Sequence, residues 1–257
     1  MPLSQFDPLV QEWFAQQFAT VTEPQQLGWP EIRSGHDVLI SAPTGSGKTL
    51  AAFLLALDGL VSRARLGELP NQTEILYVSP LKALSNDVHK NLDAPLSGIA
   101  ALARARGTPL APIRTAVRTG DTPVGERQRM TKEAPHILVT TPESLFILLT
   151  AESSRQMLRS VRTMIVDEIH AVAGSKRGSH LALSNARLEA LVGGSLQKIG
   201  LSATVSPIEE VARFLSGTSV DCTGRTTGII QVGHRRALDL AVEVPRDELG
   251  AVATNEM

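Results

Sequence analysis

Short runs of apolar residues alternate with segments of helical periodicity along most of the chain, from Asp37 onward. Runs rich in Val, Ile and Leu are typical of buried strands, whereas apolar residues spaced three or four positions apart indicate amphipathic helices. Regular alternation of the two predicts an α/β fold, in which a mostly parallel sheet carries helices on both faces. The strands are expected at Val38–Ile40, Ile75–Val78, Ile113–Val117, Ile137–Val139, Met164–Val166 and Lys198–Leu201.

The first residues have the pattern of an amphipathic helix. Asp7 stands where an N-cap is expected, and Pro8 stands at the first helical position, where proline is favoured. Trp13, Phe14 and Phe18 follow at helical spacing. We therefore expect an N-terminal helical segment over residues 1–20, with its aromatic side packed against the main sheet.

The pattern changes again after Ser216-Gly217. Two apolar runs, Ile229–Val232 and Leu238–Val244, flank residues 233–236 in the manner of a hairpin or a pair of edge strands. This tail has no pattern of a second complete domain. We expect the main domain to occupy residues 21–218 and a short C-terminal β connector to occupy residues 219–257.

Composition excludes several classes of protein. The longest apolar run, Leu50–Leu57, is far shorter than the roughly 20 residues that a membrane span needs. Met1 begins no basic-then-apolar signal segment, so we expect a cytoplasmic protein that does not contact a membrane. The single cysteine, Cys222, excludes an internal disulfide and a zinc site built from several cysteines.

The charge balance gives no overall signal for nucleic acid. The net charge is −1, whereas a basic excess is usual for a domain that binds DNA or RNA through electrostatics. Locally, residues 104–132 carry seven cations and two carboxylates. A solvated charged face explains this window at least as well as a nucleic-acid surface does, and both interpretations stay open. The cations are Arg104, Arg106, Arg114, Arg118, Arg127, Arg129 and Lys132.

Residues 42–49 fit the phosphate-binding loop, although Ala42 stands where a glycine is usual. Glycines let successive backbone N–H groups turn toward a phosphate, and the N-terminus of the following helix adds partial positive charge. Lys48 would bridge the β- and γ-phosphates, and the Thr49 hydroxyl would ligate magnesium. An apolar strand before the loop and a helix over Leu50–Leu60 supply the required context. The predicted nucleotide-binding residues here are Pro43, Thr44, Gly45, Ser46, Gly47, Lys48 and Thr49.

An acidic pair, Asp167-Glu168, follows the predicted strand Met164–Val166. Ligands of open α/β sheets bind at the carboxyl ends of the strands, which is where this pair should lie. Asp167 would hold magnesium, and Glu168 would orient or deprotonate the attacking water. Together with Lys48, the pair predicts a catalytic site for ATP hydrolysis.

With Ser202-Ala203-Thr204 at a strand end, the phosphate loop and the acidic pair resemble motifs I, II and III of superfamily 2 DEAD/DEAH-box helicases. Other segments extend the resemblance. Residues 79–84 resemble motif Ia, 118–122 the next element, 140–145 motif Ib, and 21–25 the upstream glutamine motif. Residues 167–180, 200–207 and 238–245 are most similar to the Lhr (large helicase-related) type. The resemblance covers nearly the whole chain.

This resemblance implies a RecA-like P-loop NTPase domain, the first of the two motor domains of a monomeric, ATP-dependent helicase or translocase. The cofactors would be ATP and Mg²⁺, the partner would be single-stranded DNA or RNA, and the family is linked with DNA repair. Gln25 would recognise adenine, and His170, Ser202 and Thr204 would couple the ATP site to the nucleic-acid surface. The residues that would grip phosphates without reading sequence are Pro80, Lys82, Thr119, Gly120, Thr141, Pro142 and Ser144.

Hydrolysis in this family needs arginines from a second RecA-like domain, which the resemblance places outside these residues. We therefore expect the chain alone to bind ATP weakly, without fast hydrolysis or unwinding. Two alternatives stay open. The first is another P-loop ATPase, because residues 215–217 resemble the signature of ABC-type ATPases, although they follow the acidic strand instead of preceding it. The second is a non-catalytic nucleic-acid-binding module that keeps the nucleotide site for structure.

Overall fold

A computed structural model describes residues 2–80, 92–194, 196–217 and 227–233. Its centre is a seven-stranded sheet in the order β3-β4-β2-β5-β6-β1-β7, and every pair of neighbouring strands is parallel. The strands are β1 (Val38–Ser41), β2 (Ile75–Val78), β3 (Thr115–Arg118), β4 (Ile137–Thr140), β5 (Thr163–Val166), β6 (Gln197–Ser202) and β7 (Gly228–Gln231).

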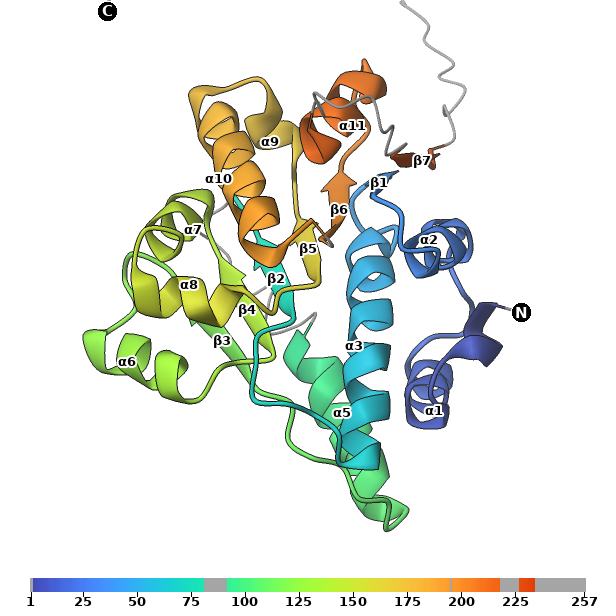
Figure 1. Cartoon of the computed structure of the whole chain (residues 1–257). Coiled ribbons are helices and arrows are strands. Elements are labelled where there is room, and N and C mark those ends of the chain that lie inside the picture. The colour runs from blue at the N-terminus through green and yellow to red at the C-terminus, as the bar shows by residue number, and fades with distance from the viewer. Residues whose placement is uncertain (1, 81–91, 195, 218–226, 234–257) are drawn as a thin grey trace, which may run out of the picture.

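Helices cover both faces of this sheet, which confirms the predicted α/β class (Figure 1). One face carries α3 (Lys48–Leu66) and α5 (Ala94–Ala105), and the other carries α7 (Pro142–Leu148), α8 (Glu152–Leu158), α10 (Lys176–Val192) and α11 (Ile208–Ser216). The remaining described helices are η1 (Pro2–Gln5), α1 (Pro8–Gln17), α2 (Glu23–Arg33), α6 (Val124–Lys132) and α9 (His170–Ala173).

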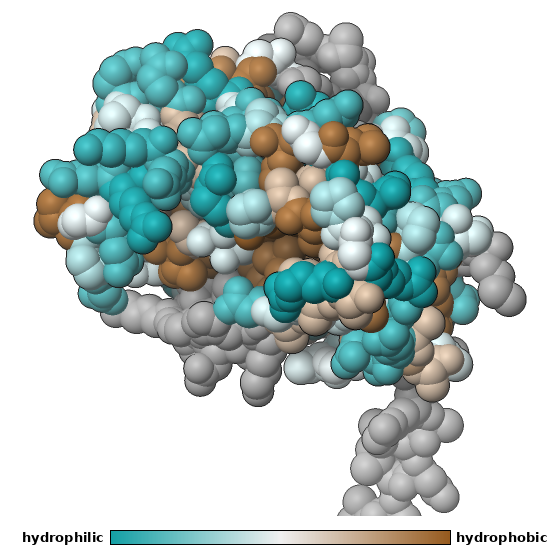
Figure 2. All heavy atoms as spheres, turned by 90° about the horizontal axis from the view of Figure 1, so that it is seen from below, coloured by the Kyte–Doolittle hydropathy of each residue, from teal (hydrophilic) through white to brown (hydrophobic). Residues whose placement is uncertain are grey.

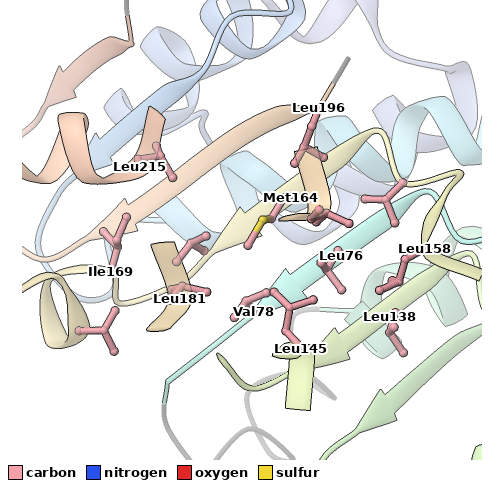
Figure 3. Packing of buried hydrophobic residues seen from close by; sticks show 14 of the residues in the cluster. Leu76, Val78, Leu138, Leu145, Leu158, Met164, Ile169, Leu181, Leu196 and Leu215 are labelled. Carbon is pink, nitrogen blue, oxygen red and sulfur yellow. The ribbon is translucent and has the colours of Figure 1, made fainter. Parts of the chain in front are cut away.

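The core lies in two layers because successive side chains of a strand point to opposite faces. On β2, Ile75 and Tyr77 join the cluster beneath α3, while Leu76 and Val78 join the cluster beneath α7 and α10. Figure 3 shows this second cluster, in which Val78 lies beside Leu145 of α7. Since the central strands are buried on both faces, they appear in the sequence as continuous apolar runs.

The N-terminal helix differs in part from its prediction. Asp7 is the N-cap of α1, since its Oδ1 accepts a hydrogen bond from the Leu9 backbone N–H at 3.0 Å. The prediction that α1 packs on the sheet is wrong: its Trp13 and Phe14 pack with residues of α2, α3 and α5. The helices α3 and α5 already cover that face, so α1 forms a further layer outside them (Figure 1). Phe18 follows the helix and is 40% exposed.

The last described strand, β7, lies at the sheet edge and pairs with β1, Val38 opposite Gly228. A prediction of an edge strand near Ile229 is therefore confirmed, although β7 extends the main sheet in parallel. Its expected partner, Leu238–Val244, lies outside the described residues, as does Cys222. Among the residues that the structure describes, no helix has the length and apolar character to cross a membrane.

Most cations of the 104–132 window form bonds within the protein. Five of the seven bond to protein oxygens: Arg106 to Glu12, Arg114 to Asn71 and Ala134 O, Arg118 to Thr119 O, Arg127 to Gly120 O and Thr122 O, and Arg129 to Glu133. Burial lowers the pKa of Arg118. These bonds hold loops and helix ends together, so the charge count alone does not mark a nucleic-acid surface.

Candidate functional site: a phosphate loop facing an acidic pair

The phosphate loop connects β1 to α3 at the carboxyl edge of the sheet. Gly45 (φ 79°) and Gly47 (φ 87°) adopt left-handed backbone conformations, and Gly47 is the N-cap of α3. Glycine is favoured at such positions because it has no Cβ. With these turns the loop leads directly into the N-terminus of α3, where free backbone N–H groups attract anions. Pro43, Thr44 and Gly45 are exposed, and Ser46, Gly47 and Thr49 are half-buried.

The acidic pair follows β5 at the same edge. Asp167 Oδ1 accepts a hydrogen bond from the Glu168 N–H at 2.9 Å, and the Tyr77 hydroxyl donates to Asp167 Oδ2. Glu168 has φ 44°, a left-handed conformation that costs a non-glycine residue about 1–2 kcal/mol. The next residue, the buried Ile169, donates its N–H to Leu201 O at 3.0 Å and anchors the turn to β6.

A chain of polar contacts joins the two segments. Lys48 Nζ lies 3.9 Å from Glu168 Oε1, and its side chain is only 6% exposed. Glu168 Oε2 lies 3.4 Å from His170 Nε2. The Ala203 N–H donates to His170 Nδ1 at 3.2 Å, so the neutral imidazole carries its proton on Nε2, facing Glu168. The loop and the carboxylates therefore converge on one space.

His170 also connects this space to β6, because Ser202 Oγ lies 3.2 Å from His170 Nδ1. The Ala42 N–H donates to Ser202 O at 3.1 Å, which ties the start of the phosphate loop to the same strand end. Thr204 is exposed, and no hydrogen bond from its side chain is found within the described ranges. Among the described residues, the predicted coupling residues His170 and Ser202 are therefore joined to the acidic pair by polar contacts, and Thr204 is not.

Gln25 lies in α2, beside the phosphate loop. It is 2% exposed, and its Oε1 accepts a hydrogen bond from the Thr22 N–H at 3.0 Å. A Cβ added to Gly47 would lie 3.0 Å from Gln25 Nε2 and 2.9 Å from Thr22 Oγ1. The glutamine segment therefore packs directly against the last glycine of the loop.

The donor set fits magnesium. In the described part of the chain, no three His, Cys, Asp or Glu residues cluster as a metal site would require. Mg²⁺, however, is usually held by one or two carboxylates together with substrate phosphates and waters. Asp167 and the hydroxyl of Thr49, in the first turn of α3, are suited to that arrangement.

The predicted nucleic-acid residues that the structure describes follow strand ends at the same edge. Thr141 is the N-cap of α7 and accepts a hydrogen bond from the Ser144 N–H at 3.3 Å, and Pro142 opens the helix. Arg177 joins two of these loops, because its Nε donates to Glu143 Oε1 at 2.7 Å and its Nη2 donates to Pro80 O at 3.0 Å. The hydrogen bond from Arg177 lowers the pKa of Glu143.

The segment after β3 forms a compact turn. The Thr119 N–H donates to Thr122 Oγ1 at 2.9 Å, and Arg127 Nη2 donates to Gly120 O at 2.8 Å. Gly120 is exposed and Pro80 is buried. Lys82, the predicted phosphate cation of motif Ia, lies outside the described residues.

Sequence reasoning missed Tyr77 and the contact of Lys48 with Glu168. Tyr77 lies on β2, ninety positions before its partner Asp167. A pattern of apolar residues marks this tyrosine only as a strand residue, and no motif includes it. Its position next to β5 in the sheet order is the signal that would have pointed to it.

Comparisons with known proteins point to a family of helicases. The sequence model of the DEAD/DEAH box helicase family matches residues 22–213. The chain is 49% identical over 256 residues to the Lhr helicase/probable uracil glycosylase of Mycolicibacterium smegmatis, covering 100% of this chain and 16% of that protein. It is also 49% identical over 250 residues to the ATP-dependent helicase Lhr-Core of Methanothermobacter thermautotrophicus, covering 97% of this chain and 29% of that protein.

Solved structures give the same result. The Mycobacterium smegmatis helicase Lhr, bound to ssDNA and AMP-PNP, has a TM-score of 0.81 and 51% identity over 90% of this chain and 28% of that chain. The DUF1998 helicase MrfA has a TM-score of 0.71 at 23% identity, over 88% of this chain and 33% of that chain, and shows the fold alone.

Proposed function

Because this chain belongs to the DEAD/DEAH box helicase family, we propose that it is the first ATP-binding motor domain of an Lhr-type nucleic-acid helicase or translocase. The chain spans 16% and 29% of the length of the two curated relatives described above, so helicase activity, substrate and partners are proposed for the longer protein. We place that protein in the cytoplasm.

One observation carries the proposal: the phosphate-loop lysine lies beside the acidic pair, with Lys48 Nζ 3.9 Å from Glu168 Oε1. A buried lysine and a neighbouring glutamate stabilise each other while no phosphate is near. A triphosphate in the loop offers Lys48 a stronger partner, since the γ-phosphate carries more negative charge than one carboxylate. Lys48 would then turn to the phosphates and release Glu168.

The released Glu168 carboxylate would accept a proton from the attacking water at Oε1. His170 would hold the other oxygen, Oε2, through its Nε2 proton, and so limit the rotation of the carboxylate. Bound Mg²⁺ would neutralise phosphate charge, and Asp167 and Thr49 would hold it. Gln25, packed against Gly47, would contact the adenine side of the nucleotide.

We propose that single-stranded DNA or RNA crosses the loops at the ends of β3 and β4. Hydroxyls and backbone groups of Thr119, Gly120, Thr141 and Ser144 would contact the phosphates without reading bases. Pro142 fixes the start of α7 beside these groups. The contacts through His170 and Ser202 would couple ATP binding and hydrolysis to these nucleic-acid-binding loops.

Thermal unfolding tests the nucleotide site. ATP with Mg²⁺ is expected to raise the melting temperature of the chain, because a ligand that binds only the folded state stabilises it by mass action. Lys48→Ala is expected to remove this shift, whereas the exposed Lys132→Ala keeps it. Equal shifts in the wild type and in Lys48→Ala, or no shift in the wild type, would contradict the proposed function.

A further inference from the structure

Tyr77 connects strand β2 with the acidic pair that follows the neighbouring strand, β5. It lies on β2, in register with Ile165 of β5, two residues before Asp167. Its hydroxyl donates a hydrogen bond to Asp167 Oδ2, and Tyr77 is only 3% exposed. Because the phenol is buried, its hydroxyl has little freedom to move away from that carboxylate.

The ring of Tyr77 is fixed from the other side by the helix that follows the phosphate loop. Phe53 of α3 lies with its ring centroid 4.8 Å from that of Tyr77, at an interplanar angle of 37°. Phe53 is 1% exposed and lies in the same helix as Lys48 and Thr49. The side chain of Tyr77 therefore contacts both Asp167 and the helix that carries Lys48 and Thr49.

Asp167 is held at both oxygens. Oδ2 accepts from Tyr77, and Oδ1 accepts from the Glu168 N–H at 2.9 Å. An ionised carboxylate has about four lone-pair positions, so a position on each oxygen stays open beyond these two bonds. The two donors fix the plane of the carboxylate while leaving it able to accept a cation.

We propose that Tyr77 is a positioning residue that orients the Asp167 carboxylate toward the magnesium of a bound nucleotide. The inference rests on the proposed function, because it assumes that Asp167 holds that ion. Groups that hydrogen-bond to a metal ligand fix its orientation and tune its basicity, and their loss typically weakens metal binding by about 10–100-fold. The aromatic ring itself packs against Phe53 in the core.

The test separates the hydroxyl from the ring. Tyr77→Phe keeps the ring contact with Phe53 and removes only the donor to Asp167. Ser184→Ala is the matched control, because it removes a fully buried hydroxyl that donates to His180 O at 3.0 Å in α10, away from the site. Fluorescent ADP is titrated onto each variant at a series of Mg²⁺ concentrations, and again in EDTA.

In Tyr77→Phe, the Mg²⁺ concentration for half-maximal nucleotide binding is expected to rise about tenfold, with affinity in EDTA unchanged. Ser184→Ala is expected to match the wild type in both. When Asp167→Asn is already present, Tyr77→Phe is expected to add no further loss, because the two residues act as one unit. This double-variant comparison tests the inference even if Tyr77→Phe lowers stability.

If nucleotide binding by the wild type depends on Mg²⁺ and Tyr77→Phe leaves that dependence unchanged, this inference is overturned and the proposed function still stands. Additive losses from Tyr77→Phe and Asp167→Asn would also overturn it. A wild-type chain that binds nucleotide with no Mg²⁺ dependence would overturn the proposed function, and this inference with it.

Discussion

Gly47 shows how one residue can serve both the backbone and the site. Its φ of 87° suits glycine, and it also lies against Thr22 and Gln25, so a side chain here meets two obstacles. Gly35 has nearly the same conformation, φ 84°, with nothing within 4 Å of the position where a Cβ would lie. A comparison of substitutions at the two glycines therefore distinguishes the effect of backbone strain from the effect of crowding at the nucleotide site.

Gly47→Ala is expected to lose nucleotide-dependent stabilisation, while Gly35→Ala keeps it. Gly35→Ala is expected to lower the free energy of unfolding by about 1–2 kcal/mol, the cost of a left-handed conformation for alanine, and Gly47→Ala by at least as much, because its Cβ also meets Thr22 and Gln25. Urea unfolding with and without ATP and Mg²⁺ measures both effects. An undiminished response to ATP in Gly47→Ala would contradict the placement of the nucleotide against Gly47.

At the scale of residues, the sequence predicts those features of the site that are formed by consecutive residues. The phosphate loop and Asp167-Glu168 are short consecutive segments, so their spacing specifies turns and strand ends directly. The hydrogen bond from Tyr77 to Asp167 depends on which strands become neighbours, and this information is not contained in either segment. The roles of the predicted site residues, Lys82 and Thr204 among them, stay predictions.

At the scale of elements, strand positions follow the apolar runs closely, and the main exception is β3. The predicted strand Ile113–Val117 begins instead at Thr115. Arg114 bonds to Ala134 O and Asn71, and Ile113 packs on the core from the preceding loop. An apolar residue in a covering loop has the same signature as a strand residue. The placement of α1 was wrong for a related reason, since periodicity shows a buried side but not what covers it.

Arg63 of α3 forms a charged pair with Glu74, the residue before β2. Arg63 Nη1 donates to Glu74 Oε1 at 2.6 Å, and Gln72 donates to the same oxygen at 3.1 Å. Burial would raise the pKa of Glu74, but these hydrogen bonds and the charge of Arg63 outweigh it and lower the pKa below 4.5. Stability from the pair is therefore present above about pH 4.5 and is lost as pH falls through the lowered pKa.

Glu74→Gln is expected to reduce the free energy of unfolding by about 2 kcal/mol at pH 7, because it weakens a charge-assisted hydrogen bond. The difference from the wild type is expected to shrink as pH falls below about 4.5. Glu152→Gln is the control, since Glu152 pairs with Arg155 at 3.6 Å and its side chain is 72% exposed. Urea unfolding at several pH values measures this, and a difference that persists unchanged at low pH would contradict it.

At the scale of the whole molecule, the parallel sheet places the functional loops on one edge. The phosphate loop follows β1, the acidic pair follows β5, and Ser202 ends β6. The carboxyl ends of the strands point away from the face that Figure 2 shows. On that face, most of the surface is hydrophilic and surrounds an apolar area. Parallel order alone therefore accounts for why segments far apart in the sequence lie together.

A crystal structure of the chain with AMP-PNP and Mn²⁺ tests most directly whether the phosphate loop and the acidic pair form one composite site. The triphosphate is expected along the backbone of Gly45–Thr49, with Lys48 turned from Glu168 toward the phosphates. The anomalous signal of Mn²⁺ is expected between the phosphates, Thr49 and Asp167. A triphosphate bound elsewhere, or an Mn²⁺ ion remote from Asp167, would contradict the central claim.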